Sequence, residues 1–474
     1  MKVVLLNTPL NDKAFPSLGL AYIVSILNKN GHDCSMHDGA NATFNEMIDF
    51  VEKENPQLVG LSMTTNYRFE VLALAKAIKE KFGCLIMLGG PHPTLMHDQV
   101  MKNYDYIDFI VRNEGEYTTL NLVNALERGE VRDNYSKILG ISFRKGKEIV
   151  HNAPAPIIED LDALPYPEWK FFDLKKYIKW SEFPFKDSPH GSIITSRGCP
   201  FRCAFCSSNN FWGYKVRFRS AQSVVDEMKY LYNTFGMKFI LFNDDNFTSD
   251  RERTIEICKL ILKEGLEKKV LWQCRAEVNI ITEELVSWMK KAGCTMIEFG
   301  VEDCTDVGLA WINKGHRAHQ VKPAFDLCKK YGIMTKSYFI VGGDFETKEN
   351  IAAKKKYIEE LNPDITTMAT LLAYPKTKVF DLGVEKGLWT EDIWLKNLEG
   401  IEYAGNVPIY TGPNLTFSEL NTASADVLFW WGRKKGYLNF GELFKNATGM
   451  IKKGEFKKLG IAVSAVIKQK LGKK

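Results

Sequence analysis

Short apolar runs alternate with amphipathic stretches over the first 150 residues. Apolar runs bounded by polar or turn-forming residues indicate buried strands, and apolar positions that recur every three or four residues indicate helices. Helices between such strands predict a parallel sheet covered on both faces. The predicted strands are Val3–Leu6, Leu58–Ser62, Leu85–Leu88 and Ile107–Val111, and the predicted helices are Leu18–Asn28 and Phe69–Lys81.

A second alternation of strands and helices begins near residue 190. Residues 151–189 interrupt the pattern and hold six prolines, which indicates a linker. Six strand–helix units then follow, and right-handed crossovers would curl them into a partial (β/α)6 barrel. The six predicted strands are Ser192–Thr195, Phe239–Phe242, Val270–Cys274, Met296–Val301, Lys336–Val341 and Ile365–Leu372.

The strand–helix rhythm fades beyond residue 378, where tryptophans among helix-like segments predict a small, mainly helical cap. A chain of 474 residues is also longer than one hydrophobic core usually supports. We therefore predict an α/β protein with a Rossmann-like domain at 1–150, a linker at 151–189, a partial barrel at 190–378 and a helical C-terminal region at 379–474. Ligands of such sheets bind at the carboxyl ends of the strands.

Charge is distributed unevenly along the chain. Residues 433–474 contain 12 Lys and Arg and two Glu, a net charge of +10, whereas the whole chain has +5. The basic character is local, so a nucleic-acid-binding surface over the whole protein is not expected. The basic tail has two interpretations, an amphipathic helix packed on the barrel or a peripheral anchor on an anionic membrane surface.

The cysteines and the apolar runs favour a cytoplasmic location. The apolar run after Met1-Lys2 is too short for a secretory signal, and Leu18–Leu27 is about half of a membrane span. Disulfides are therefore not expected. Seven of the ten cysteines lie singly in apolar stretches, which is typical of buried thiols, whereas Cys199, Cys203 and Cys206 lie within eight residues of each other.

These three cysteines form a C-x3-C-x2-C run directly after the first barrel strand. Three thiolates can bind three irons of a [4Fe–4S] cluster and leave the fourth iron open to another ligand. A zinc site is the first alternative, but zinc usually takes four ligands with paired C-x2-C spacing, and no second cysteine pair lies nearby. Chance spacing is the second. The pattern favours the cluster.

Residues 195–206, Thr-Ser-Arg-Gly-Cys-Pro-Phe-Arg-Cys-Ala-Phe-Cys, resemble the signature of radical S-adenosylmethionine (SAM) enzymes. The resemblance implies that SAM binds the open iron of the cluster. It also implies that an electron donor such as flavodoxin or ferredoxin reduces the cluster. Reductive cleavage then yields methionine and a 5′-deoxyadenosyl radical, which abstracts a hydrogen atom from the substrate.

The same resemblance assigns roles to residues that follow the later barrel strands. Asp244 or Asp245 would hold the methionine amine of SAM, and Arg275 would pair with its carboxylate. Glu302 would face the ribose, and Gly342 would lie near the adenine. The sequence departs from the family pattern at residues 303–304, where Asp-Cys replaces Ser-Gly, and at Lys376, which replaces the glycine of a Pro-Gly-Thr motif.

The N-terminal domain resembles the cobalamin-binding domain of class B radical SAM methylases. The resemblance begins with residues 5–9 and 16–20 and continues into loops that accommodate the nucleotide tail of cobalamin. The Asp-x-His-x-x-Gly motif is absent, so no histidine is expected to bind the cobalt. The alternative is a Rossmann-like module that binds nothing. The residues that match the loops or a stretch typical of the family are Ser62, Thr64, Gly89, Gly90 and Glu114.

Together the two resemblances imply cobalamin-dependent methylation of an unactivated carbon or phosphorus atom in a small or lipid-like substrate. Radical cyclisation, coupling or ring rearrangement without methyl transfer is an alternative within the same architecture. A cobalamin and iron–sulfur sensor without turnover is an alternative of another class. Several predicted SAM contacts at different strand ends favour an enzyme over a sensor.

Overall fold

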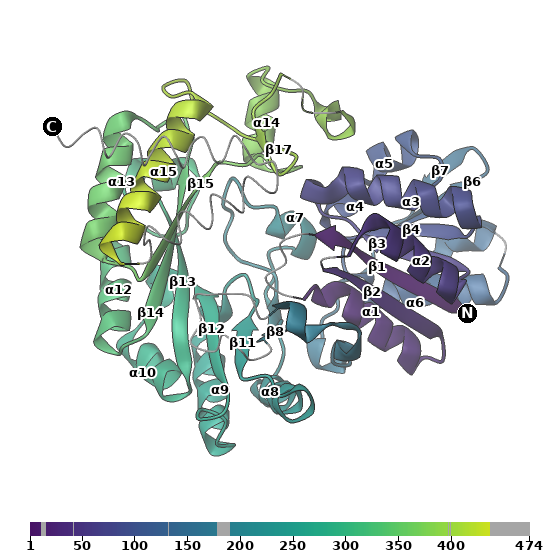
Figure 1. Ribbon diagram of the computed structural model, residues 1–474, viewed down its shortest axis with the longest axis horizontal. Coiled ribbons are helices and arrows are strands. Elements are labelled where there is room, and N and C mark those ends of the chain that lie inside the picture. Colours follow the sequence, from purple (N-terminus) through teal and green to yellow (C-terminus); the bar gives the residue numbers. More distant parts are fainter. Residues whose placement is uncertain are drawn as a thin grey trace.

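The computed structural model describes residues 1–10, 16–40, 42–130, 132–177, 190–396, 398 and 400–436. Two α/β units lie beside each other in it, as Figure 1 shows. The carboxyl end of strand β1 (Lys2–Leu10) points toward the second unit, and the short helix α7 (Ser208–Trp212) lies between the two. The carboxyl end of this central strand therefore faces the second unit.

The first unit contains a seven-stranded sheet. Its pairs from β2 to β5 are parallel, and β6 and β7 extend one edge in antiparallel pairing. This arrangement confirms the predicted Rossmann-like domain. In spatial order the strands are β2 (Asp33–Ala40), β1, β3 (Leu58–Ser62), β4 (Leu85–Gly89), β5 (Phe109–Val111), β6 (Ile141–Lys145) and β7 (Glu148–His151).

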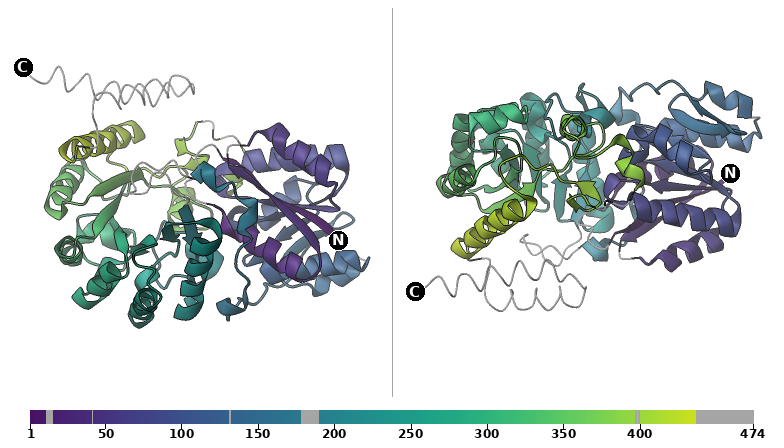
Figure 2. Two further views of the ribbon diagram at one scale, coloured as in Figure 1. Left: turned by 60° about the horizontal axis from the view of Figure 1, so that its bottom comes forward. Right: turned by 90° about the horizontal axis from the view of Figure 1, so that it is seen from above.

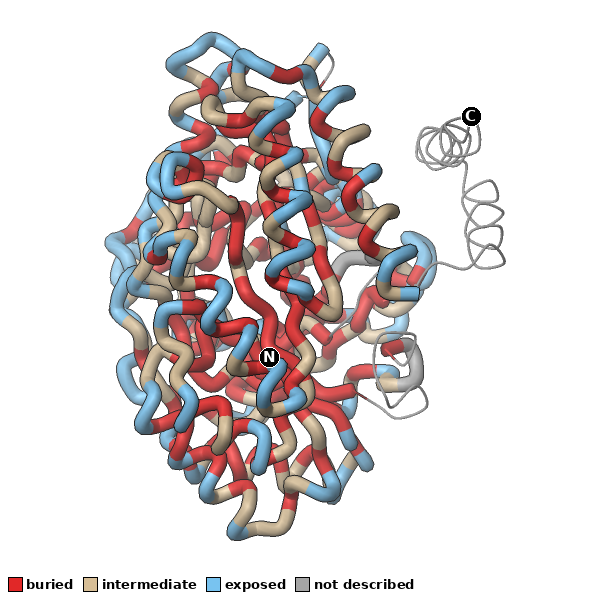
Figure 3. The backbone as a smooth tube through the Cα atoms, turned by 90° about the vertical axis from the view of Figure 1, so that its left-hand side faces the viewer, coloured by how far each residue is buried: buried red, intermediate tan, exposed pale blue. Residues whose placement is uncertain are grey.

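Helices cover both faces of this sheet because alternate residues of each strand point to opposite sides. On β1, Val3 and Leu5 belong to the core under α1 and α6, whereas Val4 and Leu6 belong to the core on the other side. Figure 3 shows the buried residues concentrated inside the molecule and the exposed ones on its outer elements. The covering helices are α1 (Leu18–Lys29) and α6 (Gly115–Glu127) on one face and α2 (Phe44–Glu54), α3 (Arg68–Phe82) and α5 (His97–Asn103) on the other.

Several elements of this unit were not predicted from the sequence, among them β2 and α2. Strand β2 is polar in sequence, Asp-Cys-Ser-Met-His-Asp-Gly-Ala, because it is an edge strand that pairs only with β1. Helix α2 follows it and begins at a capping box, in which the Glu46 N–H donates to Thr43 Oγ1 over 3.2 Å and the Thr43 N–H to Glu46 Oε2 over 2.6 Å.

The second unit is a curved sheet of six parallel strands. The strands at its two edges, β8 and β15, do not pair with each other, so the barrel is open, as predicted. Its first strand begins at His190, two residues before the predicted start at Ser192. In spatial order the strands are β8 (His190–Ile193), β11 (Phe239–Phe242), β12 (Leu271–Ala276), β13 (Cys294–Glu302), β14 (Met334–Val341) and β15 (Ile365–Thr370).

Helices surround the outside of this sheet (Figure 2). Five of them begin after a Ser, Thr or Asp whose side chain accepts a backbone N–H of the first turn, which satisfies donors that have no partner within the helix. The outer helices are α8 (Ala221–Phe235), α9 (Arg251–Lys263), α10 (Glu283–Lys291), α12 (Val321–Lys330), α13 (Lys348–Leu361) and α15 (Phe417–Lys434).

The C-terminal region closes one end of the barrel and reaches the first unit. It includes α14 (Lys378–Glu385) and α15, and Tyr410 N–H donates to Leu371 O just beyond β15 over 2.9 Å. The fully buried Arg68 of α3 donates to the Trp394 carbonyl over 2.9 Å. Residues 437–474 lie outside the described residues, so both interpretations of the basic tail stay predictions. Among the helices that the structure describes, none is long and apolar enough to cross a membrane.

Candidate functional site

A cavity of about 290 Å³ lies at the carboxyl ends of the barrel strands. We call it the cysteine cavity. It brings together six residues that the sequence analysis had named as candidates, and five charged or hydroxyl side chains that it had not indicated. The first group is Cys199, Cys203, Cys206, Asp245, Arg275 and Glu302, and the second is Ser208, Glu277, Glu298, Lys314 and Tyr338.

The loop that carries the cysteines is fixed by backbone contacts. Gly198 has a φ of +97°, and a Cβ at this position would lie 2.3 Å from the Lys215 carbonyl oxygen, so only glycine fits. Further along, the Ala204 N–H donates to the Ile312 carbonyl over 2.8 Å. These contacts hold the loop over the barrel mouth with its three thiols on the same cavity.

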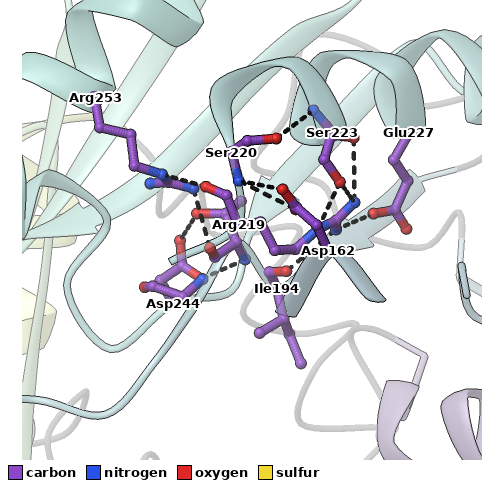
Figure 4. Close-up of polar contacts among 10 residues, drawn as sticks. Asp162, Ile194, Arg219, Ser220, Ser223, Glu227, Asp244 and Arg253 are labelled. Carbon is purple, nitrogen blue, oxygen red and sulfur yellow. Dashed lines mark hydrogen bonds and ion pairs between the residues drawn. The ribbon is translucent and has the colours of Figure 1, made fainter. Parts of the chain in front are cut away.

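Asp244 supports the start of this loop and does not line the cavity. Its carboxylate accepts the backbone N–H groups of Thr195 and Ser196 over 2.6 and 2.8 Å and the Thr195 hydroxyl over 2.6 Å. Figure 4 shows Asp244 beside Arg253, whose guanidinium donates to the carbonyl oxygens of Thr195 and Arg219. Because these partners use both carboxylate oxygens of Asp244, its neighbour Asp245 is the better placed of the two to meet a ligand.

The donor set of the cysteine cavity fits an iron–sulfur cluster better than a single ion. Among the described residues, no group of three or more His, Cys, Asp or Glu side chains is arranged to hold one metal ion. A zinc ion would need its ligands at about 2.0–2.3 Å from one point. A cubane takes each cysteine on a different iron, so its three thiols surround a larger body.

Lys314 is a buried cation on the wall of this cavity. It forms ion pairs with Glu277 and, over 3.6 Å, with Glu302. Burial alone would lower the pKa of Lys314, but the two carboxylates outweigh it and raise that pKa. His316 Nδ1 lies 3.1 Å from Glu277 Oε2, and together with Lys314 it lowers the Glu277 pKa against the effect of burial.

Glu302 has an unusual backbone conformation for a residue with a side chain. Its φ is +62°, and its carboxyl group is buried at the end of β13. Burial raises its pKa to about 7, a shift that Lys314 opposes. A Cβ at Gly300 would lie 2.4 Å from Glu302 Oε1, so the neighbouring glycine makes room for this carboxyl. Strained residues of this kind are concentrated at functional sites.

Arg275 is the most accessible cation of the cysteine cavity. Its guanidinium donates to Asn243 Oδ1 over 3.0 Å, and its Nε lies 3.5 Å from Glu298 Oε2, while 41% of the side chain stays exposed. Tyr338 donates its hydroxyl to the same Glu298 oxygen over 2.6 Å. The guanidinium is therefore held in place but can still accept an anionic group.

Gly342 lies outside the cysteine cavity as the structure defines it. Its φ is +123°, and a Cβ there would lie 2.7 Å from the Tyr410 carbonyl oxygen. The Gly412 N–H donates to the Gly342 carbonyl over 2.8 Å. The glycine thus allows the C-terminal segment to cross the end of β14, and its predicted place near adenine stays a prediction.

A second, smaller cavity of about 100 Å³ lies at the carboxyl ends of β1, β3 and β4 in the first unit. We call it the glycine-lined cavity. Ser62, Gly89, Gly90 and Glu114 line it, whereas Thr64 does not, and their predicted contacts with the nucleotide tail of cobalamin stay predictions. Gly90 has a φ of +101°, and a Cβ there would lie 2.9 Å from the Met63 carbonyl oxygen. Its apolar walls are formed by Leu5, Leu20, Ile23, Met87 and Val111.

The size of this cavity limits what part of a cobalamin can enter it. An empty apolar cavity of about 150 Å³ holds a benzene molecule, so this cavity of about 100 Å³ is smaller than the space that one ring occupies. The corrin ring is far larger and would have to lie outside. The apolar, glycine-rich walls match the edge of a flat heterocyclic base, such as that of the nucleotide tail. No histidine lines the cavity among the described residues.

Glu114 joins the two units, and both of its carboxylate oxygens have protein partners. Oε1 accepts from Arg197 over 2.6 Å, and Oε2 accepts from Arg217 over 2.7 Å and from the Ile158 N–H over 2.8 Å. Arg197 also pairs with Glu116. Both carboxylate oxygens of Glu114 are therefore used at this buried junction, where Arg197 lies two residues before Cys199. The predicted cofactor contact of Glu114 stays a prediction.

Comparison with known proteins agrees with this architecture. A family model described as the radical SAM superfamily matches residues 193–357, and one described as the B12 binding domain matches residues 11–123. An uncharacterized methyltransferase of Pyrococcus horikoshii is 33% identical over 384 residues, which cover 80% of this chain and 81% of that protein. The chain belongs to the cobalamin-binding radical SAM enzymes.

The names of other proteins similar to this radical SAM enzyme include both a cyclase and a methyltransferase. The anaerobic magnesium-protoporphyrin IX monomethyl ester cyclase of Cereibacter sphaeroides is 31% identical over 77% of this chain and 60% of the cyclase. Among solved structures, the radical SAM methyltransferase TsrM of Kitasatospora setae, with cobalamin and a [4Fe–4S] cluster bound, superposes with a TM-score of 0.72. It is 18% identical over 90% of this chain and 88% of TsrM. This likeness confirms the two-unit fold.

The residues that sequence reasoning missed have neighbours in space that are distant in the sequence. Lys314 lies in a turn after a short helix, and its neighbours Asn313 and Gly315 give it the pattern of an ordinary loop. Phe211 and Trp212 follow the cluster motif but line the glycine-lined cavity of the other unit. Their place shortly after the cysteine motif was the feature that could have indicated a role in binding. Which cavity they line could be seen only in the three-dimensional structure.

Proposed function

We propose that this radical SAM enzyme transfers a methyl group to an unactivated carbon or phosphorus atom of a small or lipid-like molecule, using cobalamin. The observation that carries the proposal is the physical link between the two cavities. Helix α7 begins two residues after Cys206, at the cysteine cavity, and its last two residues line the glycine-lined cavity. A radical generator and a methyl carrier would then lie on either side of one short helix.

The cofactors supply a 5′-deoxyadenosyl radical and a transferable methyl group when a [4Fe–4S] cluster, SAM and cobalamin are bound. Cys199, Cys203 and Cys206 hold the cluster, and Arg275 binds the carboxylate of SAM through a charge-assisted contact. Asp245 and Glu302 accept hydrogen bonds from the amine and the ribose of SAM.

The remaining lining residues position these groups and exclude water. Lys314 holds Glu277 and Glu302 on one side of the cavity. Phe201 and Phe205 line the cavity between the cysteines and limit access of water to it.

Radical cyclisation is the second candidate function. The cyclase of Cereibacter sphaeroides, at 31% identity, favours ring formation without methyl transfer. The methyltransferase of Pyrococcus horikoshii, at 33% identity and with larger coverage of both chains, favours methyl transfer. TsrM, which is described as a methyltransferase, has the same two-unit fold. Methyl transfer is therefore the leading reaction.

Labelled SAM distinguishes these functions. The protein would be reconstituted anaerobically with iron, sulfide and hydroxocobalamin, reduced, and given SAM with a trideuterated methyl group. We expect 5′-deoxyadenosine and the transfer of label into methylcobalamin, both measured by mass spectrometry. An intact cluster without 5′-deoxyadenosine would favour the sensor alternative. Production of 5′-deoxyadenosine without labelled methylcobalamin would favour cyclisation.

We also infer two partners. A one-electron donor such as flavodoxin or ferredoxin would reduce the cluster, because reductive cleavage of SAM needs an electron of low potential, within the range of about −700 to +450 mV that such clusters cover. An anionic membrane surface would bind the basic tail, with the enzyme otherwise in the cytoplasm. Such a location would suit a lipid-like substrate.

A further inference from the structure

We propose that Phe211 and Trp212 of the barrel unit complete the binding site for the nucleotide tail of cobalamin. This inference rests on the proposed function, because it assumes that the first unit binds cobalamin. In this proposal, two aromatic residues of the barrel unit contact a ligand that is bound mainly by the other unit. The radical SAM unit would thus contribute directly to cobalamin affinity.

The composition of the glycine-lined cavity is the first observation. Sixteen of its lining residues belong to the first unit, and the only others among the described residues are Phe211 and Trp212. The rings of these two residues meet edge to face, with centroids 4.6 Å apart and planes at 87°. Aromatic rings and apolar walls suit a flat heterocycle, which gains from both burial and ring contact.

The anchoring of α7 is the second observation. Asn113 Nδ2, from the loop after β5, donates to the Phe211 carbonyl over 2.8 Å. The guanidinium of Arg197 lies 5.1 Å from the centroid of the Trp212 ring while it pairs with Glu114 and Glu116. The backbone of Phe211 and the ring of Trp212 are therefore both attached to the loop of residues 113–116, which itself lines the cavity.

The free space beside Gly19 is the third observation and provides a test. Gly19 is exposed and lines the cavity, and a Cβ built on it meets no atom of the described residues within 4 Å. Its position in the first turn of α1 needs no positive φ. A leucine there would occupy part of the open space at the edge of the cavity, and leucine also favours a helix more than glycine does. Gly19→Leu should therefore block the ligand without destabilising the protein.

Hydroxocobalamin binding to the cluster-reconstituted full chain tests the proposal. We expect Phe211→Ala and Trp212→Ala each to raise the dissociation constant by about 10- to 100-fold, since each removes a large apolar contact. Gly19→Leu should abolish measurable binding. Tyr214→Ala is the matched control, because Tyr214 lies two residues beyond α7, is exposed and does not line the cavity. It should bind as the wild type does.

Hydrogen exchange of the wild-type protein gives a readout that needs no variant. Added hydroxocobalamin should slow exchange in a peptide covering residues 208–213 as well as in peptides covering residues 60–63 and 89–91. Slower exchange in the first unit alone, or wild-type affinity in both alanine variants, would overturn the inference while leaving cobalamin binding intact. Failure of the wild type to bind hydroxocobalamin would instead contradict the proposed function.

Discussion

The two cavities of this enzyme are built from opposite chemistry. The cysteine cavity contains four carboxylates, two cations and three thiols, and all of its lining residues come from the barrel unit. The glycine-lined cavity is mostly apolar, and its walls come from both units. A small charged ligand such as SAM needs paired charges within one rigid frame, whereas a flat apolar group needs only a shaped and dry space.

Because of this difference, we expect the two cavities to respond differently to mutation. Removing one charged partner from the cysteine cavity leaves another buried charge uncompensated, which is costly. Changing one apolar wall residue of the glycine-lined cavity removes a contact but leaves no unpaired charge. We therefore expect the largest effects at the cysteines and the charged cluster, and smaller effects at the junction and beyond both cavities.

The largest effect should come from the cysteines. Replacing Cys199, Cys203 or Cys206 singly with Ala should reduce cleavage of SAM to the level of a blank without enzyme, because the cluster loses one of its three ligands. The measurement is 5′-deoxyadenosine by liquid chromatography, together with bound iron. Cys258→Ala and Cys328→Ala are controls, since both thiols are buried in the core away from the cavity. A triple cysteine variant that still formed 5′-deoxyadenosine would refute the cluster assignment.

The charged cluster should show the next largest effect. Lys314→Met should lower the free energy of unfolding by roughly 3–5 kcal/mol, because Glu277 and Glu302 would lose their shared cation inside the protein. Chemical denaturation of the cluster-free chain measures this loss.

A surface lysine provides the control for this prediction. Lys322→Met breaks only an exposed pair with Asp326 and should cost less than about 1 kcal/mol. Equal effects of Lys314→Met and Lys322→Met would show that the cysteine cavity does not depend on its buried cation.

The sequence predicted most of the barrel but only part of the sites. All six barrel strands were predicted within a few residues, because buried parallel strands are short apolar runs. The cysteine motif was also recognised from the sequence, since its three cysteines lie within eight residues of the chain. Strand β2 was missed, because its polar residues lie at a sheet edge. Lys314 and Trp212 were missed because their partners are distant in sequence.

Glu114 and Asp244 illustrate a different limit of sequence reasoning. The family resemblance placed Glu114 among the cofactor-binding residues and gave Asp244 or Asp245 as the contact of the methionine amine. In the structure the oxygens of Glu114 and Asp244 accept hydrogen bonds from the backbone or from arginines. A carboxylate in a motif can either contact the ligand or support the loop beside the site. Only the positions of its hydrogen-bond partners distinguish these two roles.

The buried junction between the units should show an intermediate effect. Glu114→Gln keeps the shape of the side chain but removes the charge that pairs with Arg197 and Arg217, and we expect a loss of roughly 1–3 kcal/mol. Differential scanning calorimetry should then resolve separate transitions for the two units, and hydroxocobalamin affinity should fall because one unit supplies part of the other's cavity.

The control for the junction is a surface ion pair close by in the sequence. Lys215→Met breaks an exposed pair with Glu159 and should leave both the calorimetric profile and hydroxocobalamin affinity unchanged. A single unshifted transition for Glu114→Gln would mean that the two units stay together without this charge network.

The smallest effect on both cavities should come from the basic tail. Truncation after Gly436 removes nine lysines and two glutamates and keeps every residue that lines either cavity. Cluster loading, SAM cleavage and hydroxocobalamin binding should therefore stay at wild-type levels. Binding to anionic vesicles should fall, because each basic residue near such a surface contributes about 1 kcal/mol.

Salt and charge separate a membrane anchor from a tail that packs on the barrel. Binding of the full chain to anionic vesicles should weaken as salt rises, since screening acts over about 8 Å at physiological ionic strength. A full-length variant with Lys452, Lys453, Lys457 and Lys458 changed to Gln keeps the length of the tail and should lose much of the binding. Co-sedimentation with phosphatidylserine vesicles measures both effects. Equal pelleting of the full chain, the truncated chain and the Gln variant would exclude the anchor, whereas lower thermal stability of the truncated chain would support packing on the barrel.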